Sequence, residues 1–235
     1  MNTLQEIENF INEFNSNNDE DFSIDSIRID FSKQHKKENL EQLGNWKKIN
    51  KNDKRILEKL KRRLEDDEVT SAYQLENYNI YYYNSNKDKP RYRIATMVIF
   101  GLSQYKTDMS KKTNIPQQVV AEILSILKDV SNIDLSLDIK QTPRLELLRN
   151  HFDLKRYFDK KIKAYTDTYY INETGVLMLD KICIYDKAFK NKLTGILWRI
   201  EATISIPNIK YLALPLYEFK QITDLAKGNL WLSNR

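Results

Sequence analysis

The sequence is poor in the residues on which several classes of protein depend. It holds one cysteine, five glycines and five prolines in 235 residues. A lone thiol excludes a disulfide framework and a cysteine metal cage, and so few glycines and prolines leave no flexible linker to divide the chain. No run approaches the roughly 18 apolar residues that a membrane span needs. These absences predict a cytoplasmic protein without a membrane partner, in which Cys183 is a buried strand residue.

Charge is unevenly distributed along a chain whose net charge is +5. Residues 1–32 hold eight acidic side chains and one base, whereas residues 33–63 hold twelve Lys or Arg and four acids. Such a local excess of positive charge can neutralise several phosphates and release counterions, although a solvated helix face has the same composition. The basic residues that we expect to contact DNA are Lys36, Lys37, Lys47, Lys48, Lys51, Lys54, Arg55, Arg62 and Arg63.

Hydrophobic periodicity predicts an α+β fold with an antiparallel-rich central sheet, helices packed on one face and a short N-terminal helix. Residues 1–20 are expected to form an acidic helical appendage, and residues 21–235 one domain. The predicted strands cover residues 23–32, 77–85, 91–101, 132–139 and 196–206, with two more inside 168–187; the predicted helices cover residues 3–14, 53–67, 116–130 and 144–159 and the tail beyond Pro215.

Charged side chains recur on three of the predicted strands. Asp134 and Asp138 are four residues apart in NIDLSLDI, so both face the same side of their strand. Lys187 follows the end of another strand, and Arg199 and Glu201 share one face of a third. Carboxylates suit Mg²⁺ or Mn²⁺, and cations can stabilise a phosphoryl transition state. The alternative is a solvent-facing sheet surface with cross-strand ion pairs.

In order and spacing, these segments resemble the trans-acting Rep type of plasmid and phage rolling-circle replication initiators. That family carries an R-I-D-L-A-I-D strand, then Y-[DN]-K, then R-x-E. The matching segments here are residues 132–138 (NIDLSLD), 185–187 (YDK) and 199–201 (RIE). The resemblance covers roughly residues 24–220. It implies an initiator that binds an origin and cuts one strand with a tyrosine, which becomes joined to the 5′ phosphate while the free 3′ hydroxyl primes synthesis.

The resemblance also implies roles for particular residues. Tyr211 stands at the expected distance beyond Glu201 to be the nucleophile, with Tyr217 as the reserve. A phenol has an ordinary pKa near 10 and needs activation at neutral pH. The metal ligands would be Asp134, Asp138 and Glu201, and the groups stabilising the phosphate would be Lys187 and Arg199. The implied partner is origin DNA, single-stranded at the nick, while a helicase partner and a homodimer stay open.

Two features depart from known initiators. Asn132 stands where the Rep family has arginine, and the His-hydrophobe-His metal motif of other rolling-circle initiators is absent, because His35 and His151 are far apart in sequence. Any metal would therefore be held by carboxylates.

Two other classes of function also fit the sequence. Residues 108–130 resemble a helix-turn-helix with a strand after it, which would suit a non-catalytic origin- or operator-binding protein with a winged-helix-like segment. The acidic N-terminal helix would suit an accessory protein that docks on a partner.

Overall fold

The computed structural model of the chain describes residues 3–32, 40–50, 52–64, 69–76, 78–85, 94–102, 117–160 and 162–229. Lys36, Lys37, Lys51 and the first part of the helix-turn-helix-like segment lie outside these ranges. None of the helices described is both long enough and apolar enough to cross a membrane. The predicted α+β class is confirmed, because helices accompany a large antiparallel sheet. The chain forms two compact units, which are described separately below.

The first unit comprises residues 1–5 and 25–132. Its strands lie in the order β2-β3-β4-β5-β1, and neighbouring strands in this order pair antiparallel. The elements are β1 (Ser23–Ser32, whose first two residues belong to the second unit), β2 (Trp46–Lys48), α3 (Lys54–Leu64), β3 (Val69–Leu75), β4 (Ile80–Ser85), β5 (Ile94–Phe100) and α4 (Gln117–Ile126).

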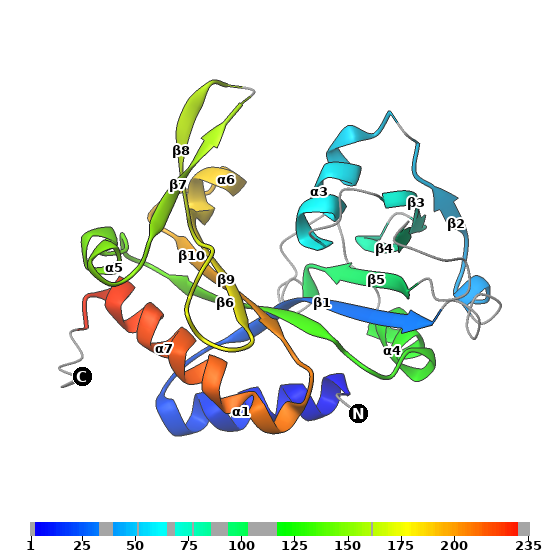
Figure 1. The fold of residues 1–235 in the computed structure, drawn as a ribbon, viewed down its shortest axis with the longest axis horizontal. Helices are drawn as coiled ribbons and strands as arrows, with labels where there is room; N and C mark the ends of the chain where they lie inside the picture. The colour runs from blue at the N-terminus through cyan, green and yellow to red at the C-terminus, as the bar shows by residue number, and fades with distance from the viewer. Residues whose placement is uncertain are drawn as a thin grey trace. The chain divides into compact units, whose positions relative to one another are not determined.

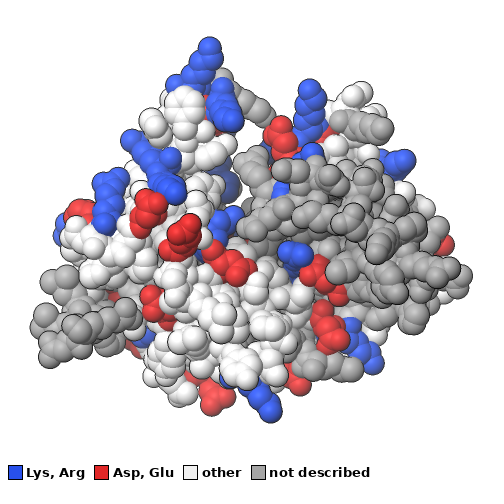
Figure 2. Space-filling model, viewed as in Figure 1, with Lys and Arg blue, Asp and Glu red and all other residues white. Residues whose placement is uncertain are grey.

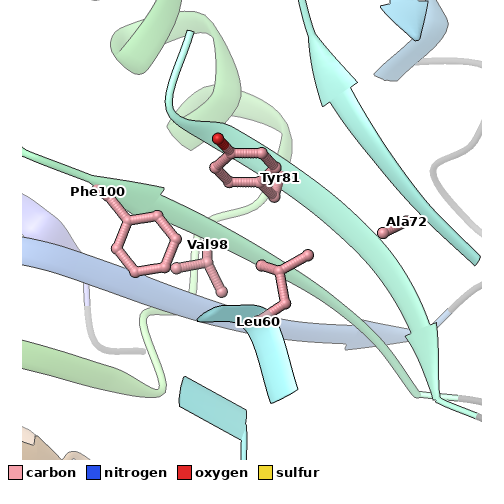
Figure 3. Close-up of a cluster of buried hydrophobic side chains, with 5 residues drawn as sticks. All are labelled: Leu60, Ala72, Tyr81, Val98 and Phe100. Atoms are coloured by element: carbon pink, nitrogen blue, oxygen red, sulfur yellow. The ribbon is translucent and has the colours of Figure 1, made fainter. Parts of the chain in front are cut away.

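Helix α3 covers one face of this sheet with its apolar stripe. Leu60 is fully buried among side chains of β3, β4 and β5, and Ile56 and Leu57 pack at the edge of the same cluster. Figure 3 shows the buried members together: Leu60, Ala72, Tyr81, Val98 and Phe100. Burial of this stripe stabilises the helix, because its remaining side chains are mostly charged and an isolated helix of this length is only marginally stable in water.

The second unit comprises residues 6–24 and 133–235. Its strands lie in the order β6-β10-β9-β8-β7. The elements are α1 (Leu4–Asn18, whose first two residues belong to the first unit), β6 (Asn132–Ile139), α5 (Leu145–His151), β7 (Leu154–Asp159), β8 (Ala164–Ile171), β9 (Leu179–Asp186), α6 (Lys187–Asn191), β10 (Trp198–Ser205), η3 (Ile209–Tyr211) and α7 (Ala213–Lys227) (Figure 1).

Alternation along β6 and β10 gives this sheet one apolar and one polar face. Ile133, Leu135, Ile200 and Ile204 point to the apolar face and are fully buried. The polar face takes the alternate residues, which include both aspartates of β6 and the Arg-x-Glu pair of β10. The sequence pattern had predicted this separation, and it leaves the charged side chains of three strands on one surface.

Helix α1 and the segment that follows it, residues 19–22, pack against α7 through aromatic and charged side chains. The Phe22 ring lies 6.0 Å from Phe14 and 4.7 Å from Phe219, measured between ring centroids. The buried Glu20 carboxylate pairs with Lys220 at 3.4 Å and with Lys227 at 3.0 Å. The helix predicted to be an appendage is thus tied to the C-terminal helix, while the boundary at residue 20 stays a prediction.

One predicted element was wrong in type. The helix expected over residues 144–159 ends at His151, where the chain becomes extended at Phe152, and residues 154–159 form strand β7. Strand β7 pairs antiparallel with β8, from Leu154 opposite Ile171 to Asp159 opposite Ala164. Its conformation is therefore set by a partner strand, which local periodicity does not reveal.

Candidate active site

The three motifs noted in the sequence come together on adjacent strands of the second unit. Strand β10 lies between β6 and β9 in the sheet. In the antiparallel register of β9 and β10, Arg199 stands opposite Tyr185 and Glu201 stands opposite Cys183. Because paired residues share a face of the sheet, side chains that lie far apart in the chain meet on the polar face.

Asp138 is the centre of this meeting point. Its carboxylate accepts hydrogen bonds from Arg199 Nε at 2.6 Å and Nη2 at 3.0 Å, a two-pronged contact. Lys187 Nζ donates a third bond at 2.5 Å. Burial opposes ionisation of the carboxyl group, but the hydrogen bonds from Arg199 and Lys187 outweigh it and hold the pKa of Asp138 below its ordinary value. The aspartate is therefore charged at neutral pH and keeps both cations in place.

Glu201 and Tyr185 form the second half of the site. The Tyr185 hydroxyl donates to Glu201 Oε1 at 2.7 Å. Arg199 Nη1 lies 3.9 Å from the same oxygen, so this guanidinium connects both carboxylates. The side chain of Arg199 is only 8% exposed, which fixes its position. We call Asp138, Tyr185, Lys187, Arg199 and Glu201 the Asp138–Glu201 network.

The network combines the groups that phosphoryl transfer to a phenol requires. Two cations can neutralise charge on a phosphate, a carboxylate is positioned to take a phenolic proton, and a tyrosine hydroxyl is already bonded to that carboxylate. The Lys190 ammonium lies 3.9 Å from the centroid of the Tyr185 ring, a cation–π contact that helps to hold the ring in place. Neither Tyr185 nor Lys190 was predicted from the sequence to have a role, and it is the register of β9 against β10 that places Tyr185 beside the Arg-x-Glu pair.

Asp134, one of the three expected metal ligands, lies apart from Asp138. Asp134 accepts a hydrogen bond from Thr203 at 2.7 Å, and its position is about 13 Å along β6 from Asp138, at about 3.3 Å per residue. Among the residues that the structure describes, no three His, Cys, Asp or Glu side chains are grouped so that they could hold a metal ion. The side chains as they lie do not fit a three-carboxylate site, and metal dependence stays a prediction.

Cys183 lies on β9, as predicted, but is half-buried rather than buried. Burial and then the negative charge of Glu201 raise the pKa of its thiol to about 12, against the smaller opposing effect of Lys190. The thiol is therefore protonated at neutral pH and is a poor nucleophile.

The two tyrosines expected as nucleophiles lie beyond the end of β10. Tyr211 ends the short helix η3 and is exposed. The chain leaves the sheet at Ser205, about 20 Å along the strand from Arg199. Tyr217 belongs to α7, where its ring packs 4.9 Å from Phe14 beside a hollow of about 160 Å³ between α1 and α7.

The basic residues expected to contact DNA belong to the first unit where they are described. Lys47 and Lys48 are exposed on β2, and Lys54 and Arg55 are exposed in the first turn of α3. Cations at a helix N-terminus are unfavourable for the helix itself, so these two have no helix-stabilising role. Arg62 and Arg63 lie in α3, but their side chains are outside the described residues.

The chain was compared with known proteins at the levels of family, sequence and structure. No protein-family model matches it, and no curated protein sequence matches it. Among solved structures, it is similar to the rolling circle replication initiator protein from Geobacillus stearothermophilus, with 11% sequence identity and a TM-score of 0.41. The match covers 85% of this chain and 79% of that chain. This likeness concerns the fold alone and says nothing about the roles of individual residues.

Proposed function

We propose that the protein is a DNA replication initiator that cuts one DNA strand at the Asp138–Glu201 network by joining it to a tyrosine. The observation that supports this proposal is the convergence of the three sequence motifs, since Asp138 bonds Lys187 and Arg199 while Tyr185 bonds Glu201. A purely structural surface would need only neighbouring opposite charges. A phenol held against a carboxylate, next to two cations already ordered by an aspartate, goes beyond that need.

The reaction follows from the groups present. Lys187 and Arg199 bind the phosphate of the strand to be cut and stabilise the charge that develops on its oxygens. The tyrosine oxygen forms a bond to phosphorus, and the bond between phosphorus and the 3′ oxygen breaks. Glu201 takes the phenolic proton, and the leaving 3′ oxygen takes a proton from water. The products are a 5′-phosphotyrosine and a free 3′ hydroxyl, which can prime synthesis or reverse the reaction.

Two tyrosines compete for the role of nucleophile. Motif spacing indicates Tyr211, whose hydroxyl is accessible to a strand from solvent. Contact with a proton acceptor favours Tyr185, whose oxygen lies 2.7 Å from Glu201. A nucleophile must lie within hydrogen-bond reach of the base that takes its proton. We therefore propose Tyr185 as the nucleophile, and Tyr211 remains the prediction from the sequence motifs.

The test is covalent capture of DNA. Purified protein is incubated with single-stranded oligonucleotides of pooled sequence and Mn²⁺, and a band of protein carrying DNA is sought on a denaturing gel. Mass spectrometry of the adduct then identifies the modified tyrosine. We expect Tyr185→Phe to lose the adduct by at least about a hundredfold, the scale expected when a group essential to the chemistry is removed, and Tyr217→Phe to retain it. Loss in Tyr211→Phe with retention in Tyr185→Phe would return the role to Tyr211.

Metal dependence is measured in the same assay by adding a chelator and restoring Mg²⁺ or Mn²⁺. The prediction from sequence is that the adduct disappears without divalent ions. If neither the wild-type protein nor any variant forms an adduct with any DNA, while DNA is still bound, the protein is a non-catalytic DNA-binding protein.

A further inference from the structure

The connection between β9 and β10 has an unusual composition. Residues 187–197, which we call the basic connection, contain Lys187, Lys190 and Lys192 and no acidic residue. Every residue from 189 to 196 is exposed. A loop that merely joins two antiparallel strands needs only a few residues, whereas this one is eleven residues long and carries three positive charges.

Apolar side chains stand among these lysines. Phe189 is 84% exposed, Ile196 59% and Leu193 52%. Single exposed apolar residues are common on protein surfaces and need no explanation. Three within eight residues, interleaved with lysines and with no acid among residues 187–197, are instead typical of a surface that binds an anionic partner with flat apolar parts.

The basic connection is ordered before any ligand arrives. The Asp186 side chain caps α6 by accepting a bond from the Phe189 backbone N–H at 2.8 Å. The backbone N–H groups of Lys187 and Ala188 both donate to the Leu197 carbonyl, at 2.9 and 3.0 Å, which closes the base of the loop. Ala188 is buried and anchors the turn. Because the backbone is held in this way, the exposed Phe189 ring is presented at little further cost in conformational entropy.

The same segment leads directly out of the Asp138–Glu201 network. Its first residue, Lys187, bonds Asp138, and Lys190 lies over the Tyr185 ring. Figure 2 shows that Lys and Arg side chains gather over the part of the second unit that holds β7, β8 and α6. A strand bound along the basic connection would therefore lead toward the two cations of the network.

We infer that the basic connection binds unpaired DNA, with the Phe189 ring stacked on a base and Lys190 and Lys192 in contact with phosphates. The choice of DNA as the ligand rests on the proposed function; the choice of an unpaired strand rests on the exposed ring, since bases offer their faces to an aromatic side chain only when they are not stacked in a duplex. The complementary charge argues against a basic or neutral partner.

The test uses a fluorescent single-stranded DNA oligonucleotide and the full chain in an anisotropy titration. Phe189→Ala should weaken binding about 5- to 100-fold, the range for one base–aromatic stack, whereas Phe189→Trp should bind as the wild type does. Lys192→Asn suits the left-handed backbone at that position (φ 56°). It should reduce the slope of log K against log salt by about 0.7, the value for one phosphate contact on a single strand.

The matched control is Leu177→Ala, because Leu177 is also exposed (74%) in the second unit but lies outside the basic connection. It should bind as the wild type does. Thermal denaturation should show unchanged midpoints for Phe189→Ala and Leu177→Ala, since neither side chain is buried. Equal binding by Phe189→Ala and wild type, equal losses in both alanine variants, or tighter binding of an RNA oligonucleotide or an acidic peptide would each overturn the inference.

Failure of this inference is separable from failure of the proposed function. If the wild type never forms a covalent adduct but Phe189→Ala still loses affinity for DNA, the binding surface stands and the cutting reaction does not. If the wild type cuts DNA and Phe189→Ala leaves both Kd and KM unchanged, the cutting reaction stands and the binding surface does not. If both the cutting reaction and the binding surface stand, Phe189→Ala should raise KM by the same factor as Kd. It should change kcat by less than about twofold, because the lost contact stabilises the bound substrate and the transition state equally.

Discussion

At the scale of single residues, Asp138 has the most consequential environment. It receives two bonds from a guanidinium that is itself almost completely buried, and a third from an ammonium group. Arg199 cannot lose its proton near neutral pH, so it needs a nearby carboxylate to compensate for burial. Asp138 therefore positions the two cations, Lys187 and Arg199, as well as neutralising their charge.

The effect of pH on stability follows from the lowered pKa of Asp138. A carboxyl group whose pKa is lower in the folded than in the unfolded state adds stability that is complete above about pH 4 and is lost as pH falls through the folded value. Asp138→Asn should lower the free energy of unfolding at pH 7 by about 1–2 kcal/mol, since a charged hydrogen-bond acceptor is replaced at a partly exposed site.

Urea denaturation at pH 7 and pH 3 measures both parts of this prediction. The difference between wild type and Asp138→Asn should shrink at the lower pH. Asp153→Asn is the matched control, because Asp153 pairs with Lys155 at an exposed site and should contribute little at either pH. A constant difference between wild type and Asp138→Asn across this range would contradict the lowered pKa.

At the scale of elements, the sequence predicts what is encoded locally. Alternation in residues 132–139 predicts β6 and both of its faces, because Ile133 and Leu135 alternate with Asp134 and Ser136. The short strand β2 and the strand β3, where Ala72 and Leu75 are buried, escaped prediction. Their conformation depends on pairing with each other and with β4. The periodicity of one strand does not determine which strands lie beside it in the sheet.

The candidate site, too, was predictable only in the part that each strand encodes locally. The faces of Asp138, Arg199 and Glu201 follow from the alternation within each strand. Their contact depends on β10 lying between β6 and β9, which requires the tertiary fold. The bond between Tyr185 and Glu201 depends in addition on the register of β9 against β10, and a shift of one residue would turn Tyr185 to the other face.

The contact between α1 and α7 gives a prediction about these two elements. Glu20 is buried between Lys220 and Lys227, and Asp224 pairs with Lys220 at 2.6 Å. Burial alone would lower the pKa of Lys220, but the bonds to Asp224 and Glu20 outweigh it and raise that pKa. Glu20→Gln leaves two lysines sharing one carboxylate, so the free energy of unfolding should fall by about 1–3 kcal/mol.

Chemical denaturation followed by circular dichroism checks the effect of Glu20→Gln. Glu13→Gln serves as the control, because Glu13 is an exposed acid on α1, the helix that ends two residues before Glu20, and it should change stability by no more than about 0.5 kcal/mol. A Glu20→Gln protein as stable as the wild type would show that α1 is held by its aromatic contacts alone.

At the scale of the whole molecule, each unit carries its own basic surface. The first unit exposes Lys47 and Lys48 on β2, and the second exposes Lys190 and Lys192 of the basic connection. Strand β2 stands at the end of the strand order, so it is an edge strand. Lysines on an edge strand have an alternative explanation, because charge there prevents pairing with another sheet.

Salt dependence of duplex binding separates the two explanations. If Lys47 and Lys48 contact phosphates, the double variant Lys47→Gln/Lys48→Gln should reduce the slope of log K against log salt by about 1.8, at about 0.9 for each contact on B-DNA. Lys128→Gln, an exposed lysine of the same unit, should leave the slope unchanged. If instead the double variant keeps the full slope and aggregates at lower concentration than the wild type, the two lysines protect the sheet edge, and DNA is bound elsewhere. Because Lys192 belongs to the other unit, combining Lys192→Asn with the double variant should reduce the slope for a partly single-stranded duplex by the sum of the separate reductions.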